Sequence, residues 1–395
     1  MSLERHSLRH ESDPDGFTPF AVSLPTNSDP GLAVLVAAMP RMLRDGPDPG
    51  FAVLVNALVT EDVERRRDKT CLVALRSGAK LLVDTRDRFG LMMTYGWVGE
   101  TGDLNVLCRL ARPPARVVDV GANFGLYSIL MGRRVGPRGR VFAFEPVPGM
   151  FDLLVRNIEL NDLGGIVAAN SCCVAGSAGE RDFFVAKSAS FSGLHNTGRS
   201  PIEKVVKVPA VALDEIELLA EAPIDLMKID VEGAELEVFS GAARLIERSP
   251  EIIIQFEASH KNMGADAERD LTQCLTSFAA RGFVVRSGFA DGEPGRVLRT
   301  AEEMQKAMVG NLYLASSEAS NRRLLEAIEA ERMREDNALS ETPSDRDILS
   351  VILPRYRNAI ADLRDTKGLQ LSPLHNLVPL HNLVRRLAKF FSGSA

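Results

Sequence analysis

The stretch that decides the fold is VVDVGANFG, from Val117 to Gly125, a short apolar run that ends in a glycine-rich turn. Such a run predicts a buried strand, and the residues from Gly125 to Val135 predict a helix directly after it. Gly121 and Gly125 allow the backbone to pass close to a ligand, while the helix directs its free N–H groups toward the turn. Asp119 is placed to accept a hydrogen bond from a ligand's ammonium group or to fix the loop. A tight connection without a ligand has the same pattern, so the turn alone leaves both interpretations open.

Strands and helices alternate on the carboxyl-terminal side of this turn. Further strands are predicted over residues 140–144, 166–169, 226–229, 252–256, 283–286 and 311–314. Helices are predicted between them over residues 151–160, 235–247 and 266–281. A hairpin over 71–84 precedes this series, and a β-rich insertion over 181–211 interrupts it. Strands that are separated by helix-length segments indicate an α/β fold with a parallel sheet covered on both faces.

The composition is that of an ordinary globular protein, with 45% hydrophobic and 25% charged residues in a chain of 395. The formal net charge of -6 argues against a nucleic-acid partner, because nucleic-acid-binding domains normally present a basic field. The five cysteines form no C-x-x-C pair, which argues against a zinc site and fits a reducing compartment. We find no signal peptide and no run of roughly 18 apolar residues. We therefore expect a cytoplasmic protein without a transmembrane segment.

The two ends of the chain differ in character from its middle. Residues 1–70 predict a disordered tail followed by a helical extension, residues 71–316 a catalytic domain, and residues 317–395 a helical carboxyl-terminal extension. The hexapeptide PLHNLV occurs at 373–378 and again at 379–384. The basic, apolar stretch at 383–391 fits peripheral membrane contact, or packing on the parent domain or on a second copy of the chain.

Acidic residues stand where the predicted strands end. Glu145 follows the second strand, 24 residues after Gly121, which is near the spacing at which an acid meets ribose hydroxyls. Asp230 and Glu232 follow the strand at 226–229, and Glu257 follows the next one. Because ligands of open α/β sheets bind outside the carboxyl ends of the strands, these acids are expected to surround one site.

Two kinds of chemistry are open to the acids at the later strands. Glu257 and His260 are the candidates for a general base, although a histidine just beyond a strand is more often a structural hydrogen-bonding residue. Asp230 and Glu257 could alternatively hold a divalent cation through oxygen ligands, which we do not favour. The flexible segment from Ser188 to His195 is either a substrate lid or a plain loop.

Together, these motifs resemble the FkbM-type S-adenosylmethionine-dependent methyltransferase family over about residues 72–316. The matching pieces are Val118 to Ser128, Phe144-Glu145-Pro146 with Asn157 and Asn161, Lys228 to Glu235, the strand ending in Glu257, and the lead-in segment Tyr95 to Glu100. The resemblance implies a class I methyltransferase, Rossmann-like sheet of seven strands, the last of them antiparallel. The segment from Ala258 to His260 does not match the family pattern, which leaves the base open.

The resemblance also implies roles for single residues. Asp119, Gly121 and Asn123 would hold the methionine end of S-adenosylmethionine, Glu145 its ribose, and Cys172 its adenine, while Asp230 would lie beside the sulfonium. The full set of predicted cofactor-binding residues is Glu100, Asp119, Gly121, Ala122, Asn123, Gly125, Tyr127, Glu145, Pro146, Cys172, Asp230 and Glu232. Asp230, Glu257 and His260 are the predicted catalytic residues.

The predicted reaction is methyl transfer from S-adenosylmethionine to a hydroxyl group of a small-molecule or glycan acceptor. A nicotinamide-dependent oxidoreductase is the first alternative, but its G-x-G-x-x-G fingerprint lacks the middle glycine here, where Asn123 stands. A non-catalytic scaffold that assembles into a homo-oligomer through its carboxyl-terminal helices is the second alternative.

Overall fold

The structure is a computed structural model that describes residues 22–23, 69–75, 77–94 and 101–340. Nearly all of the predicted amino-terminal tail and helical extension, and Glu100, lie outside the described residues. The hexapeptide repeat and the basic, apolar stretch at 383–391 lie outside them as well.

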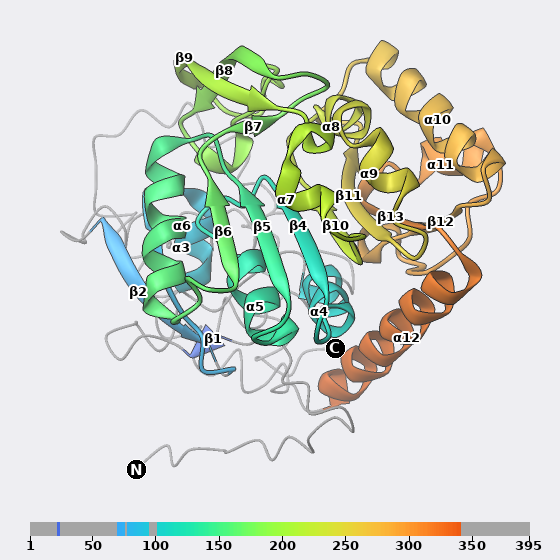
Figure 1. Cartoon of the computed structure of the whole chain (residues 1–395), viewed down its shortest axis with the longest axis horizontal. Coiled ribbons are helices and arrows are strands. Elements are labelled where there is room, and N and C mark those ends of the chain that lie inside the picture. Colours follow the sequence, from blue (N-terminus) through green and yellow to red (C-terminus); the bar gives the residue numbers. More distant parts are fainter. Residues whose placement is uncertain (1–21, 24–68, 76, 95–100, 341–395) are drawn as a thin grey trace, which may run out of the picture.

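A seven-stranded sheet forms the centre of the molecule, in the order β12-β13-β11-β10-β4-β5-β6 (Figure 1). Its strands are β4 (Arg116–Val120), β5 (Arg140–Phe144), β6 (Val167–Asn170), β10 (Leu226–Ile229), β11 (Ile253–Ser259), β12 (Val284–Ser287) and β13 (Val309–Ala315). Strands β6, β5, β4, β10 and β11 pair in parallel, whereas β13 is antiparallel to both of its neighbours. This is the sheet expected of a class I methyltransferase, so the predicted fold class is confirmed.

Helices cover both faces of this sheet. One face carries α3 (Arg88–Thr94), α4 (Thr101–Leu110), α5 (Leu126–Val135), α6 (Pro148–Leu160) and α12 (Glu318–Ser340). The other carries α7 (Glu217–Ala220), α8 (Glu235–Gly241), α9 (Ala243–Glu247), α10 (Ala265–Ala280) and α11 (Ala301–Lys306). Each layer buries its own apolar cluster against the sheet, which explains why the central strands are apolar on both sides.

The predicted hairpin is present as β2 (Thr70–Leu75) and β3 (Lys80–Asp84), with β1 (Val22–Ser23) beside β2. Two asparagines of α6 attach the hairpin to the main sheet layer. The side chain of Asn157 accepts from the N–H of Leu82 and donates to its carbonyl, and Asn161 does the same with Lys80. These side-chain amides take the place of a neighbouring strand along the edge of β3. The Asn157 amide also donates to the carbonyl of Phe124 at the glycine-rich turn, so hairpin and turn share one support.

The β-rich insertion forms a separate sheet in the order β7-β9-β8, near the top of Figure 1. Its strands are β7 (Cys173–Val174), β8 (Gly179–Ala186) and β9 (Ile202–Val211). The connection from β8 to β9 contains the short helix η1 (Ala189–Phe191). The other short 3₁₀ turns are η2 (Leu213–Glu215) and η3 (Phe289–Asp291).

One helical region differs from the sequence-based expectation, whereas α12 lies within the predicted helical extension. The helix predicted over 235–247 is two helices, because the Asp214 carboxylate of η2 accepts from the N–H groups of Arg244 and Leu245 and starts α9 afresh. Helix α12 starts just after β13 and packs against α4, where Asn105 donates to the buried carboxylate of Glu331 (Figure 1). The proposed domain boundary near residue 316 remains a prediction. Within the described ranges, no helix combines the length and apolar character that a membrane span requires.

Candidate functional site

A cavity of about 390 Å³ opens at the carboxyl ends of β4, β5, β10 and β11. Its volume lies in the range of about 300–1,000 Å³ that is typical of small-molecule sites. One wall is the glycine-rich turn, and another is the segment 188–194 that contains η1, which we call the strap. The cavity therefore lies at the edge of the sheet where the sequence predicts a ligand.

The glycine-rich turn follows β4 directly and has an unusual backbone. Gly121, Asn123 and Gly125 have φ values of 80°, 51° and 95°, which lie in the left-handed region. The N–H groups of Gly121 and Ala122 both donate to the carbonyl of Phe144, which fixes the turn to β5. A Cβ atom on Gly121 would lie 1.9 Å from the carbonyl oxygen of Asp230. Glycine is therefore required here both for its dihedral angles and for the close approach of two strand ends.

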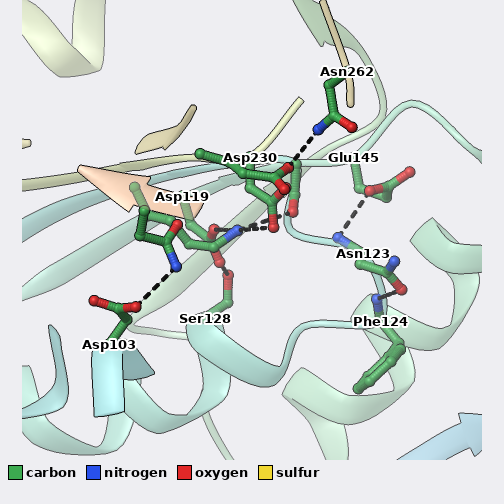
Figure 2. A network of polar contacts seen from close by, with 12 residues as sticks. Asp103, Asp119, Asn123, Phe124, Ser128, Glu145, Asp230 and Asn262 are labelled. Atoms are coloured by element: carbon green, nitrogen blue, oxygen red, sulfur yellow. Dashed lines mark hydrogen bonds and ion pairs between the residues drawn. The ribbon is translucent and has the colours of Figure 1, made fainter. Parts of the chain in front are cut away.

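Glu145, at the end of β5, connects the turn with the next helix. One carboxylate oxygen accepts from the N–H of Asn123 at 2.8 Å (Figure 2). The other accepts from the N–H of Val147 at 2.7 Å. Burial raises the pKa of Glu145 to about 7, against the lowering effect of these two N–H groups. The side chain also lines the cavity, so its oxygens can accept hydroxyl groups from a ligand there.

A buried lysine of β10, Lys228, contacts acids at the ends of β4 and β10 and lines the cavity. The Nζ of Lys228 lies 3.1 Å from Asp230 and 3.7 Å from Asp119, and 4.6 Å from the centre of the Tyr127 ring. Asp119 itself is fully buried and accepts from the Ser128 hydroxyl at 2.6 Å. Burial raises the pKa of Asp119, and the positive charge of Lys228 acts against that rise. Because Asp119 does not line the cavity, its position favours the fixing of the loop over direct contact with a ligand.

Three carboxylates meet at the end of the cavity next to β10 and β11. Asp230, Glu232 and Glu257 each offer one oxygen within 4.8 Å of the others. Each of them has a donor: Lys228 Nζ contacts Asp230, Arg199 Nη1 lies 2.9 Å from Glu232, and Asn262 Nδ2 lies 2.9 Å from Glu257. Arg199 also donates to the Asn262 side chain. We call these three acids, with Arg199 and Asn262, the acid cluster.

The structure brings most of the predicted site residues together. Those that line the cavity are Gly121, Ala122, Asn123, Tyr127, Glu145, Pro146, Cys172, Asp230, Glu232 and Glu257. Burial raises the pKa of the Cys172 thiol to about 11, so this wall is neutral. Gly125 stands behind the turn as the residue that precedes α5, where a Cβ would meet Leu154. His260 is the exception among the catalytic candidates, because its ring nitrogen Nδ1 lies 2.7 Å from Glu268 of α10 and the ring does not line the cavity.

Four residues of the site have no role in the sequence-based prediction: Lys228, Arg199, Asn262 and Phe89. Lys228 has a local signal, since a lysine inside an apolar strand needs a buried counter-charge. Arg199 and Phe89 line the cavity from the β8–β9 connection and from α3, and Asn262 in the loop after β11 bonds Glu257. Nothing near these three residues in the sequence indicates this.

Comparison with known proteins agrees with this geometry. Residues 119–285 match the methyltransferase FkbM domain, and they contain the glycine-rich turn, Glu145 and the acid cluster. Methyltransferase sdnD of Sordaria araneosa is 33% identical over 154 residues, which are 32% of this chain and 59% of that protein. Hexuronic acid methyltransferase AglP of Haloferax volcanii is 28% identical over 179 residues, or 45% of this chain and 68% of that protein. The FkbM domain match is confined to this stretch, which is less than half of the chain.

The fold was also compared with a solved structure, which aligns with part of this chain at low sequence identity. The O-methyltransferase of Bacillus cereus, in complex with S-adenosylhomocysteine, covers 55% of this chain and 80% of its own, with 15% identity and a TM-score of 0.32. The family and the sheet order thus rest on the FkbM match and on the strand pairing described above.

Proposed function

We propose that this FkbM-domain protein transfers the methyl group of S-adenosylmethionine to a hydroxyl oxygen of a sugar or a related natural product. The observation that supports this most is the convergence of three features on one cavity: the Gly121 turn, Glu145, and the carboxylates at the ends of β10 and β11. The turn and Glu145 would hold the donor, and the acid cluster faces the space left for an acceptor. The substrate of the Haloferax relative, a hexuronic acid, makes a sugar acceptor the first class to test.

The residues at the turn fit this donor. Gly121 has no side chain where the backbone borders the cavity, and the oxygens of Glu145 face the same space, where they can accept the two ribose hydroxyls. Cys172 and Val174 offer a neutral wall for the adenine. The donor supplies an electrophilic methyl group on a positively charged sulfur, and the carboxylate of Asp230 provides a negative charge at the adjoining strand end.

The acid cluster would prepare the acceptor. Glu257 lines the cavity and its carboxylate is held by the Asn262 amide at 2.9 Å, so it can take the hydroxyl proton while the new bond forms. Asp230 is oriented by its contact with Lys228 Nζ at 3.1 Å. Alignment of the acceptor oxygen with the methyl group would account for much of the acceleration. Glu257 is therefore the general base of this proposal, and His260 has no part in it.

Two measurements test the proposal in sequence. Titration calorimetry with S-adenosylhomocysteine and with NAD separates a methyltransferase from an oxidoreductase, since only the first ligand should bind. Glycan fractions are then incubated with S-adenosylmethionine that carries a labelled methyl group, and the label is located by mass spectrometry. Glu257→Gln should lower the transfer by about 100-fold or more while S-adenosylhomocysteine still binds. Binding of NAD alone, or label on protein nitrogen instead of glycan oxygen, would contradict the proposal.

A further inference from the structure

The strap forms a wall of the cavity although it belongs to the β8–β9 insertion and not to the main sheet. Six of its seven residues line the cavity: Ser188, Ala189, Ser190, Phe191, Ser192 and Leu194. Phe89 of α3 lines it as well, so the α3 region and the insertion meet across the opening. A wall built from a connecting segment needs fixed points outside the segment if it is to keep its shape.

The first fixed point is Asp87, in the turn between β3 and α3. The residue is only 4% exposed, and its carboxylate accepts hydrogen bonds both from α3 and from the strap. Oδ2 accepts from the N–H groups of Phe89 and Gly90, at 2.9 and 3.1 Å, and so caps the start of α3. Oδ1 accepts from the Ser188 hydroxyl at 2.9 Å and from the Ser190 N–H at 3.4 Å, and the Ser190 hydroxyl lies 3.2 Å from both Oδ1 and Oδ2. One buried carboxylate thus joins the strap to the amino-terminal hairpin and α3.

The second fixed point is Arg199, at the other end of the same connection. Its guanidinium lies over the ring of Phe191, 4.2 Å from the ring centre, while Nη1 bonds Glu232 at 2.9 Å. The backbone of Glu232 has a φ of 54°, in the left-handed region that residues other than glycine rarely adopt. The strap is therefore held between α3 on one side and the acid cluster on the other.

From this arrangement we infer that Asp87 is a positioning residue of the proposed transferase: it holds the strap over the cavity and so retains the bound donor. The inference rests on the proposed function, because it takes the donor pocket as given. Asp87 does not line the cavity, so it acts through Ser188 and Ser190. A hydrogen bond from a hydroxyl to a buried carboxylate is worth more than a neutral one, so loss of both bonds should free the strap.

The variant Ser188→Ala/Ser190→Ala tests this, because it removes the hydroxyl bonds between the strap and Asp87. It leaves the longer bond from the Ser190 N–H to Oδ1 and the bonds from the N–H groups of Phe89 and Gly90 to Oδ2. The matched control is Ser240→Ala/Ser277→Ala, which changes two exposed serines of α8 and α10 that are not in the cavity wall. Asp87→Asn is a second route to the same effect, since its amide oxygen can still cap α3 but its NH₂ group cannot accept from a serine.

The readouts are hydrogen exchange of the strap amides without ligand, and the dissociation rate of tritiated S-adenosylhomocysteine chased with unlabelled ligand. In Ser188→Ala/Ser190→Ala we expect faster exchange at residues 188–192 and a dissociation rate that is raised by about 10-fold. The melting temperature should fall by no more than about a few degrees, and the control should match the wild type in all three measurements. Unchanged exchange and unchanged dissociation in the double variant would overturn the inference. A wild-type protein that does not bind S-adenosylhomocysteine would instead overturn the proposed function, and the exchange data would still show whether Asp87 holds the strap.

Discussion

At the donor end the cavity wall comes from one short stretch of chain and its neighbours, whereas at the strap end it is assembled from distant segments. Asn123 and Glu145, which bond each other at the donor end, are 22 residues apart. Asp87 and Ser188, which hold the strap, are 101 residues apart, and Arg199 and Asn262 are 63 apart. The donor end is thus determined by strand ends of the sheet, while the strap end depends on how insertions pack on it.

The largest expected effect comes from a methyl group placed at the donor end. Gly121→Ala would put a Cβ 1.9 Å from the carbonyl oxygen of Asp230 at a residue whose φ is 80°. We expect a loss of about 3 kcal/mol or more in the free energy of unfolding and no detectable binding of S-adenosylhomocysteine. Gly164→Ala is the control, because nothing lies within 4 Å of its added Cβ, and its effect should stay within about 0.5 kcal/mol. Urea unfolding and calorimetry measure both quantities.

The corresponding glycine at the acceptor end sharpens the comparison. A Cβ on Gly233, whose φ is 97°, would lie 2.5 Å from the carbonyl oxygen of Asn262. Gly233→Ala should displace Asn262 and with it Glu257, so methyl transfer should fall while S-adenosylhomocysteine still binds. If this variant lost ligand binding as completely as Gly121→Ala, the two ends of the cavity would not be separable.

A smaller effect should appear in the pH dependence of donor binding. Because burial raises the pKa of Glu145 to about 7, this carboxyl gains its charge between pH 6 and pH 8. The ionised Glu145 carboxylate can accept hydrogen bonds from ligand hydroxyl groups at both oxygens. The affinity for S-adenosylhomocysteine should therefore rise with pH across this range. Linkage limits the change to about tenfold per pH unit below the pKa, and we expect about three- to tenfold between pH 8 and pH 6.

A second buried glutamate provides the control for this titration. Burial also raises the pKa of Glu235 to about 7, but this side chain does not line the cavity. Glu145→Gln should flatten the pH dependence of the dissociation constant, whereas Glu235→Gln should retain it. The opposite pattern would assign the titration to the start of α8 and would remove Glu145 from the donor site.

The difference between the two ends also explains how far the sequence alone could lead. Apolar runs and the turn after Val120 indicate the sheet, and strand ends then place Glu145, Asp230 and Glu257 at one edge. Because β11 pairs with β13 as far as Ser259, Glu257 lies two residues before the end of its strand, but still at the same edge of the sheet. Asp87 and Arg199 gave no such signal, because their partners are set by packing between segments and not by the period of a strand or helix. The position of His260 has the same cause. Only the packing of α10 shows that the carboxylate of Glu268 contacts the imidazole ring.

The smallest expected effect concerns a divalent cation at the acid cluster. Asp230, Glu232 and Glu257 lie close enough to share a metal ion, but each carboxylate already has a nitrogen donor. A cation would have to displace these nitrogen donors. The positive charges of Lys228 and Arg199 already offset part of the negative charge of the carboxylates, and they would repel a further cation. We therefore expect exhaustive treatment with EDTA to leave both S-adenosylhomocysteine affinity and methyl transfer unchanged. Loss of transfer that Mg²⁺ or Mn²⁺ restores would show instead that the cluster is a metal site, and that Arg199 moves aside when the ion binds.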